Sequence, residues 1–299
     1  MPNLDLVPKK DVSSFRKIAI GTWRTAYDPS VYGTMELRMD EAMRYIAEFR
    51  ARTGRRLTVS HLLAKASAIA LRDCPDANSI LRWNRVYLRK NIGIFFQVVM
   101  TDEGEGKTDL SGATLYDVED KTLVQILDEF EEKVDKVRKR QDPALEKTRG
   151  LFLSIPYLML NFVLRVISFL SYTLNLDLRA LGIPKDPFGS LMITNIGTLG
   201  LDTAYVPLVP YSRVPILLAA GAVKEEPIVV DGKVTVGKVM RVNATFDHRF
   251  IDGFHAAVMS RTLRRYIEHP FENFDALDDV EAAARNGSGA LRSDAEAAP

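Results

Sequence analysis

The sequence contains very little cysteine and little histidine. Among its 299 residues there is one cysteine, Cys74, and there are four histidines. A single cysteine excludes an intramolecular disulfide and any zinc site built from several cysteines. Cys74 follows an apolar stretch of helical character, so we expect a buried, inert thiol rather than a nucleophile.

The sequence also has no excess of charge of one sign. The net charge is +1 and charged residues make up 26% of the chain, so we expect no nucleic-acid partner. No glycine-rich phosphate-binding loop and no internal repeat is found. Residues 1–13 contain no apolar run after their charges, which argues against a secretory signal and favours a cytoplasmic protein.

Hydrophobic periodicity indicates an ordinary globular core, as does the 46% content of hydrophobic residues. One buried strand is expected at 86–100, a hairpin with an Asp-Gly turn at 229–234, and a polar loop or turn at 101–109. In the second predicted helix, Ser60 is expected to be the N-cap. Helices are expected at 40–54, 57–75, 120–141 and 255–270.

One long apolar segment, LFLSIPYLMLNFVLRVISFLSYTL at 151–174, prompts a transmembrane interpretation. Pro156, Asn161 and Arg165 argue against a simple span, because a charge near the bilayer centre is costly. We favour a buried or oligomer-packing helix pair. Contact with a membrane surface or an acyl chain is the alternative, and a true span is the least favoured.

The stretch TFDHRFIDGFHAA at 245–257 carries the chemistry that the composition otherwise lacks. A β-rich run ends at His248, and Gly253 permits a sharp turn into the next helix. Histidine can accept a proton near neutral pH, but as a base it needs another group to fix its ring. From residue types alone, a partly buried histidine with a purely structural role is the favoured interpretation.

The spacing His-x-x-x-Asp-Gly at 248–253 resembles the signature of chloramphenicol acetyltransferase. With Asp247 before it and Arg249 after it, the motif is still more similar to the dihydrolipoyl acyltransferases, the core subunits of 2-oxo acid dehydrogenase complexes. These two groups share one fold and one mechanism. Four further segments resemble the family in the family's own order, namely SSFRKIAIGTW (13–23), LTVSHLLAKASAIALRDCPDANS (57–79), NIGIFFQV (91–98) and the stretch from SLMITNIG to DGKV (190–234).

The resemblance implies residue roles. His248 is expected to be the general base, which takes a proton from a thiol or hydroxyl as that group attacks an acyl thioester. Thr194 stands where the family has a hydroxyl that hydrogen-bonds the tetrahedral oxyanion. Asp252 is expected to hold the histidine-bearing turn by pairing with an N-terminal arginine; Arg16 matches by position and Arg24 is a rival.

The remaining histidines and the turn near Thr194 have supporting parts in this interpretation. Asn195 and Gly197 are expected to shape the turn that presents the threonine. His61 and His255 are expected to be structural, and His269 to lie on the surface.

The resemblance further implies an α/β (α+β) chloramphenicol acetyltransferase-like fold, with a mixed β-sheet flanked by helices. It implies a homotrimer with active sites between subunits, and coenzyme A as the acyl-CoA substrate, without a metal. We expect an N-terminal arm at 1–13, a catalytic domain at 14–274 with an extra apolar helical insertion at about 140–186, and a mobile polar tail at 275–299.

No lipoyl domain is expected on this chain, so a lipoyl group would come from a separate protein. The polar tail favours a free trimer over a larger shell. Two alternatives remain open at this stage. One is a non-catalytic trimeric scaffold that organises partner proteins, and the other is an O-acetyltransferase of small hydroxyl compounds.

Overall fold

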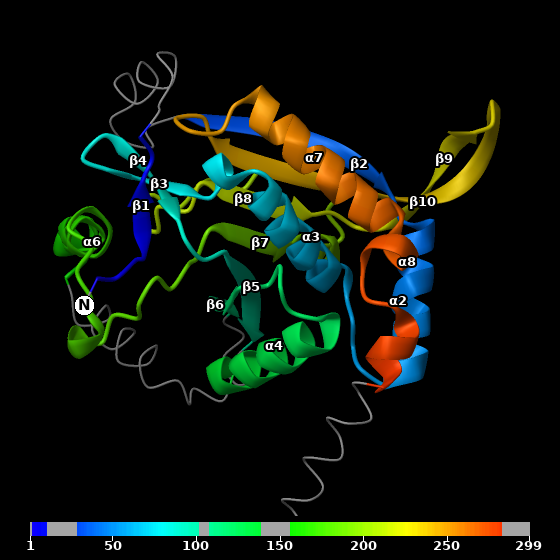
Figure 1. Cartoon of the computed structure of the whole chain (residues 1–299), viewed down its shortest axis with the longest axis horizontal. Helices are drawn as coiled ribbons and strands as arrows, with labels where there is room; N and C mark the ends of the chain where they lie inside the picture. Colours follow the sequence, from blue (N-terminus) through cyan, green and yellow to red (C-terminus); the bar gives the residue numbers. More distant parts are fainter. Residues whose placement is uncertain (1, 11–28, 102–107, 139–155, 283–299) are drawn as a thin grey trace, which may run out of the picture.

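The structure of the protein, a computed structural model, describes residues 2–10, 29–101, 108–138 and 156–282 (Figure 1). Arg16 and its rival Arg24 lie outside the described residues. The helices are α2 (Asp40–Thr53), α3 (Val59–Asp73), α4 (Leu123–Arg138), α6 (Tyr157–Ser168), α7 (Gly253–Glu268) and α8 (Pro270–Asn273). The strands are β1 (Leu6–Pro8), β2 (Ser30–Arg38), β3 (Ser79–Arg82), β4 (Arg85–Arg89), β5 (Gly93–Thr101), β6 (Thr108–Tyr116), β7 (Leu191–Asn195), β8 (Ile216–Ala220), β9 (Lys224–Val230) and β10 (Lys233–Asp247).

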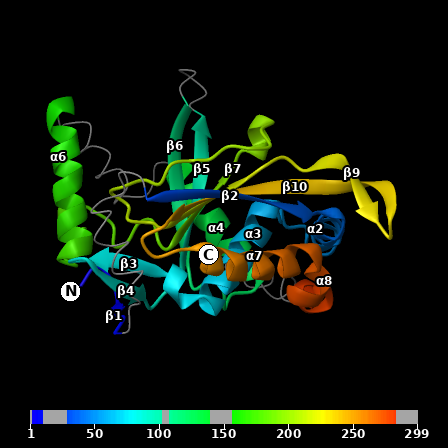
Figure 2. The same cartoon turned by 90° about the horizontal axis from the view of Figure 1, so that it is seen from above.

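A large mixed sheet organises the chain. Its strand order is β2-β10-β8-β7-β5-β6, and β9 pairs with the first half of β10. Strands β5, β7 and β8 run parallel, whereas β2, β6 and β9 are antiparallel to their neighbours. Helices α3 and α7 lie side by side across one face of the sheet (Figures 1 and 2). The predicted fold class, a mixed sheet flanked by helices, is confirmed.

The predicted hairpin is confirmed in detail. Val230 pairs with Lys233, and Asp231 and Gly232 both have positive φ, as a two-residue turn with primed geometry requires. The hairpin β9–β10 extends away from the body of the molecule, at the end opposite α6 (Figures 1 and 2).

The single strand predicted at 86–100 is wrong, because the segment forms two strands in two sheets. β4 belongs to a small sheet of order β1-β4-β3, and β5 enters the large sheet. The change of sheet occurs at the exposed residues Lys90 and Asn91. Both strands are largely apolar, so the alternation of side chains alone does not reveal where the chain leaves one sheet for the other.

The N-cap of helix α3 lies two residues before the predicted Ser60. Its N-cap is Thr58, whose backbone is extended, and Ser60 lies inside the first turn. The Nδ1 atom of His61 accepts a hydrogen bond from the Thr58 amide at 3.1 Å, which completes a reciprocal cap. A ring nitrogen that accepts a hydrogen bond carries no proton, so Nδ1 of His61 is unprotonated. His61 caps the start of the helix, which is a structural role, as expected.

The stability of the protein is expected to fall in mild acid because of His61. Burial, with help from Arg50 and Arg56, lowers the pKa of His61 from 6.5 to about 4. Between these values the unfolded chain binds a proton that the folded chain does not, so acid favours unfolding. Urea unfolding from pH 7 to pH 4 should lose about 3 kcal/mol of unfolding free energy through this group.

The matched variants are His61→Gln and, at an exposed position, His269→Gln. The first should flatten the dependence of unfolding free energy on pH, and the second should leave it as in the wild type. An equal acid loss in wild type and His61→Gln would show that His61 does not cause it.

The mobile tail predicted from residue 275 is wrong for residues 275–282. Leu277 and Val280 are buried in the main core, at a spacing that suits one helical face. The Asp275 carboxylate accepts a hydrogen bond from the Leu123 amide at the start of α4, at 2.5 Å. The Asp275 carbonyl accepts one from the Tyr45 hydroxyl at 2.7 Å. The burial of these two apolar side chains in the core therefore outweighs the polar character of the residues around them.

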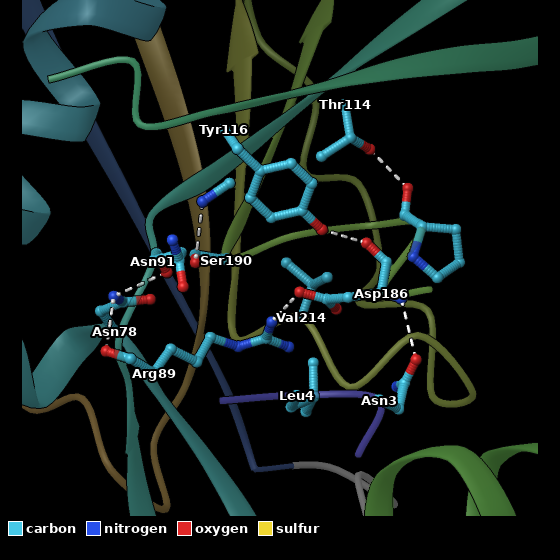
Figure 3. A network of polar contacts seen from close by, with 12 residues as sticks. Asn3, Leu4, Asn78, Arg89, Asn91, Thr114, Tyr116, Asp186, Ser190 and Val214 are labelled. Carbon is cyan, nitrogen blue, oxygen red and sulfur yellow. Dashed lines mark hydrogen bonds and ion pairs between the residues drawn. The ribbon is translucent and has the colours of Figure 1, made fainter. Parts of the chain in front are cut away.

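A buried polar network joins the small sheet to the chain just before β7 (Figure 3). The Arg89 guanidinium pairs with the Asp186 carboxylate at 2.6 Å, and both side chains are almost fully buried. The Asp186 amide donates to the Asn3 side chain at 3.1 Å, and the Tyr116 hydroxyl donates to the Asp186 carbonyl. Because a buried charge is costly without its partner, this network fixes where the chain re-enters the large sheet.

The apolar segment 151–174 contains one helix, α6, in its described part, followed by a π-helical turn at Phe169–Thr173. Within the chain α6 is not buried: Met159, Phe162 and Val166 are exposed. The expectation of a buried or oligomer-packing helix pair is therefore wrong for α6 as regards burial within the chain, and packing between subunits stays a prediction. In the described residues no helix has the length and apolarity needed to cross a membrane.

Candidate active site

His248 follows the last residue of β10, where the strand turns toward α7. Its amide donates to the Pro29 carbonyl at 2.7 Å, and its side chain is half-buried. The Nδ1 atom lies 2.8 Å from the Ile251 carbonyl oxygen. A carbonyl can only accept, so Nδ1 carries the proton and Nε2 keeps the lone pair. This is the tautomer that a general base acting through Nε2 requires.

The turn that carries His248 is anchored by a buried ion pair. The Asp247 carboxylate accepts hydrogen bonds from the Arg249 guanidinium, from Nε to Oδ1 at 2.9 Å and to Oδ2 at 3.1 Å, and from Nη2 to Oδ2 at 2.5 Å. The Asp247 amide donates to the Pro215 carbonyl at 2.9 Å, and the Asp247 carbonyl accepts from the Ile251 amide at 3.0 Å. The ion pair between the two side chains that flank the histidine, together with these backbone hydrogen bonds, therefore holds the turn in place.

Asp252 is the N-cap of α7. Its carboxylate accepts hydrogen bonds from the Phe254 and His255 amides, at 3.0 and 3.2 Å. The His255 Nδ1 atom lies 2.7 Å from the same carboxylate oxygen. An ionised carboxylate only accepts, so Nδ1 of His255 donates, and its 3.3 Å contact with the Asp252 amide is secondary. Asp252 thus caps the helix start. Its expected pairing with Arg16 involves a residue outside the described part of the chain and stays a prediction.

Thr194 lies near the end of β7, half-buried, beside Ala219 of β8. A tight turn follows it. The Asn195 side-chain oxygen accepts from the Thr198 amide at 3.2 Å, and the Thr198 hydroxyl donates to the Asn195 carbonyl at 2.9 Å. A Cβ atom on Gly197 would lie 2.6 Å from the Gly221 carbonyl oxygen, so only glycine fits this approach.

The sheet register keeps Thr194 and His248 apart within one chain. Thr194 is level with Ala219, which is paired with Asn243 of β10, five residues before His248. Five residues along a strand and two strand spacings across the sheet place the two Cα atoms about 19 Å apart. One chain therefore brings His248, Asp252, Asp247 and Arg249 together, but it does not bring Thr194 to them.

Sequence reasoning found the turn but missed two of its supports. Asp247 had no assigned role, although an acid and an arginine two residues apart around a histidine are a signal for the ion pair seen here. His255 was expected to be structural, but its contact with the Asp252 carboxylate was not foreseen. Its position three residues after an N-cap aspartate is the available signal. Cys74 is buried as expected, and burial raises the pKa of its thiol.

Comparison with protein families identifies the family to which this chain belongs. A profile of the family described as 2-oxoacid dehydrogenases acyltransferase (catalytic domain) matches residues 10–154 and 187–274. This chain belongs to that family. The match includes the segments that hold Thr194, His248 and Asp252, and residues 155–186 lie outside it. The family resemblance read from the motifs is therefore confirmed.

Three similar proteins illustrate the relationship. The lipoamide acyltransferase component of the branched-chain alpha-keto acid dehydrogenase complex of Pseudomonas putida is 33% identical over 81 residues, which is 27% of this chain and 19% of that protein. The dihydrolipoyllysine-residue acetyltransferase component of the pyruvate dehydrogenase complex of Rhizobium meliloti is 24% identical over 250 residues, which is 81% of this chain and 45% of that protein. The chain thus spans less than half the length of these two relatives.

A solved structure of dihydrolipoamide acetyltransferase from Azotobacter vinelandii has a TM-score of 0.60 and 22% identity to this chain, and the match covers 89% of this chain and 99% of that one. That structure concerns the role of a serine, a histidine and an asparagine in the catalytic mechanism of that enzyme, the last two four positions apart. The likeness shows that the acetyltransferase core and this chain share a fold.

Proposed function

We propose that this protein is a coenzyme A-dependent acyltransferase that moves an acyl group between acyl-CoA and a dihydrolipoyl-type thiol. The observation that carries the proposal is the tautomer of His248, because Nδ1 donates to the Ile251 carbonyl and Nε2 is left as an acceptor. The membership of the chain in the acyltransferase family supports the same chemistry.

In the proposed reaction, Nε2 of His248 removes the proton of the acceptor thiol as the sulfur attacks the carbonyl carbon of the acyl thioester. The carbonyl π electrons move to oxygen and form a tetrahedral oxyanion. The Thr194 hydroxyl donates a hydrogen bond to this oxyanion. When the intermediate collapses, the bond to the coenzyme A sulfur breaks, and that sulfur takes the proton back from Nε2.

We infer that the site is assembled between two subunits, with His248 from one chain and Thr194 from the next. The separation of about 19 Å within one chain supports this arrangement, since both groups must contact one acyl carbon. A homotrimer provides three such sites. The acceptor is inferred to be the lipoyl group of a separate protein, as the names of the relatives suggest.

In this site Asp252 stands four residues after His248, where the Azotobacter enzyme has an asparagine at the same spacing. A carboxylate and an amide can both cap a helix, but only the carboxylate carries a charge. The proposal therefore assigns Asp252 to holding the turn, with Arg16 as its predicted partner, and leaves proton transfer to His248.

The test is coenzyme A release by the purified protein from acyl-CoA donors of increasing chain length, with dihydrolipoamide as acceptor. Release that requires both the acceptor and His248 would support the proposed reaction. Release of free coenzyme A without acylation of the thiol would point to a hydrolase. A protein that forms trimers but turns over no donor would favour the scaffold alternative.

Substitution of Thr194 is expected to separate its hydroxyl from its shape. Thr194→Ala should lower kcat by about a hundredfold or more, because one oxyanion donor is worth roughly that factor. Thr194→Ser keeps the hydroxyl and should retain most of the rate. Steady-state kinetics of both variants make the comparison, and an equal loss in the two would assign Thr194 to packing instead.

A further inference from the structure

An exposed apolar stripe runs along α6. Met159, Phe162 and Val166 follow each other at intervals of three and four residues, and Phe169 continues the row on the π-helical turn. This spacing puts all four side chains on one face of a helix. They are all exposed, and Phe162 is 65% exposed. Leu160, Val163, Leu164 and Ile167 of the same helix are partly buried, and the polar residues Asn161 and Arg165 are exposed.

A second element extends the stripe. Trp83, at the tip of the turn between β3 and β4, lies against Phe169, with ring centroids 5.8 Å apart, and is still 63% exposed. Trp83 and Asn84 both have positive φ, at 51° and 58°. This backbone region is unfavourable for a bulky residue, and glycine suits it better. The strained turn therefore displays an indole that the chain itself hardly buries.

The two segments that form this surface carry charge of one sign. Between Glu146 and Asp177 the sequence contains no acidic residue, and from Ser79 to Lys90 it contains none either. The turn reads Arg-Trp-Asn-Arg, so Arg82 and Arg85 flank the indole. An apolar surface with tryptophan and arginines at its border suits the region of a bilayer between acyl chains and anionic headgroups.

We propose that α6 and the Trp83 turn form a docking surface for a membrane that carries anionic lipids. In this arrangement α6 lies in the plane of the interface, with Met159, Phe162 and Val166 in the acyl-chain boundary. The tip of the β3–β4 turn inserts beside it. Helix α6 lies in the segment 155–186, outside the match to the family, whereas the Trp83 turn lies within the match.

A second copy of the chain in a two-fold contact is a less suitable occupant. Such a contact would place this surface against itself, so Arg82 and Arg85 of one copy would meet the arginines of the other; a contact within the proposed trimer would place it against a different surface and is an outcome of the sedimentation experiment below. No acidic side chain of these two segments is there to balance them. Phosphate groups of a bilayer provide that balance directly.

The first measurement is co-sedimentation of the full chain with vesicles of phosphatidylcholine alone and with about 30% phosphatidylglycerol. Phe162→Glu tests the surface. Val234→Glu is the matched control, because Val234 is 76% exposed on the hairpin at the opposite end of the molecule (Figure 1). Both variants add one negative charge to an exposed apolar site, so the difference between them reports the surface itself.

Binding is expected with the anionic vesicles, and Phe162→Glu should weaken it at least about tenfold, since one buried phenylalanine side chain contributes that much. Val234→Glu should bind within about twofold of the wild type, because its side chain stays in water. Absence of binding to anionic vesicles, or equal binding by the two variants, would overturn the proposal.

Tryptophan fluorescence provides an independent measurement. The chain has two tryptophans, so Trp23→Phe leaves Trp83 as the sole source of tryptophan fluorescence. Its emission should shift to the blue on addition of anionic vesicles and be quenched by lipids brominated on their acyl chains. An unchanged spectrum would contradict insertion of the turn. Self-association of the wild type in sedimentation velocity that Phe162→Glu abolishes, without vesicle binding, would overturn the proposal in favour of a second copy.

Discussion

Replacement of His248 by alanine is expected to lower kcat by a factor of about 10² to 10⁴, the usual contribution of a general base. The structure supports a loss of this size because Nδ1 is committed to the Ile251 carbonyl and the ring is held in one orientation. The fold should be unaffected, since the turn is anchored by the Asp247–Arg249 pair. Single-turnover acyl transfer at saturating donor measures the chemical step directly.

His269→Ala is the matched control, because it removes an exposed imidazole from the same region of the sequence. It should show the kinetics of the wild type. If His248→Ala keeps more than about a tenth of the wild-type rate, another group provides the base, since a positioned base contributes far more than that. Loss of the melting transition in His248→Ala would instead assign the side chain to folding.

Two inactive variants are expected to form active assemblies when mixed. His248→Ala keeps Thr194, and Thr194→Ala keeps His248. If each site takes its histidine from one chain and its threonine from the next, a mixed ring contains interfaces at which both groups are intact. Subunits unfolded and refolded together at equal concentrations should regain about a quarter of the wild-type rate, the fraction of intact interfaces in random rings.

The control is to refold each variant alone and then mix the two without exchange, which should give only the residual activities. A mixture that regains no activity although the subunits have exchanged would show that one chain contains the whole site. Exchange itself is followed by mass, with one variant isotopically labelled. The register of β7, β8 and β10 predicts recovery, because it separates the two groups within the chain.

Local features of the sequence predicted the helices, the hairpin and the turn at His248. The Asp231-Gly232 turn and Gly54 at the end of α2 act on their own backbone, so a few neighbouring residues suffice to predict them. The site was found because its motif is continuous. Asp247, His248, Arg249 and Asp252 lie within six residues of one another.

Features that depend on distant partners were not predictable in the same way. The division of 86–100 between two sheets depends on β1, which pairs with β4, and on β7, which pairs with β5, and both lie far away in the sequence. The packing of Val280 depends on a core assembled elsewhere. The sequence showed that α6 is apolar. Whether other parts of the chain cover this helix depends on the folded surface, and the expectation that it is buried within the chain was wrong.

The C-terminal end of α6 is hydrogen-bonded to the segment that supports the turn carrying His248. Ser168, the last residue of the helix, accepts a hydrogen bond from Nε of Arg213 at 3.0 Å. Arg213 precedes Pro215, whose carbonyl receives the Asp247 amide. Burial and the neighbouring Arg249 lower the pKa of Arg213, a sign that its charge is hard to accommodate there.

Helix α6, which lies outside the family match, is therefore bonded to the rest of the fold. Excising it would remove the hydroxyl that accepts a hydrogen bond from Arg213, a half-buried cation that feels the charges of the Arg249–Asp247 pair at the His248 turn. The surface proposed for membrane contact and the support of the His248 turn therefore share one end of a helix, so a change in the first is expected to alter the second.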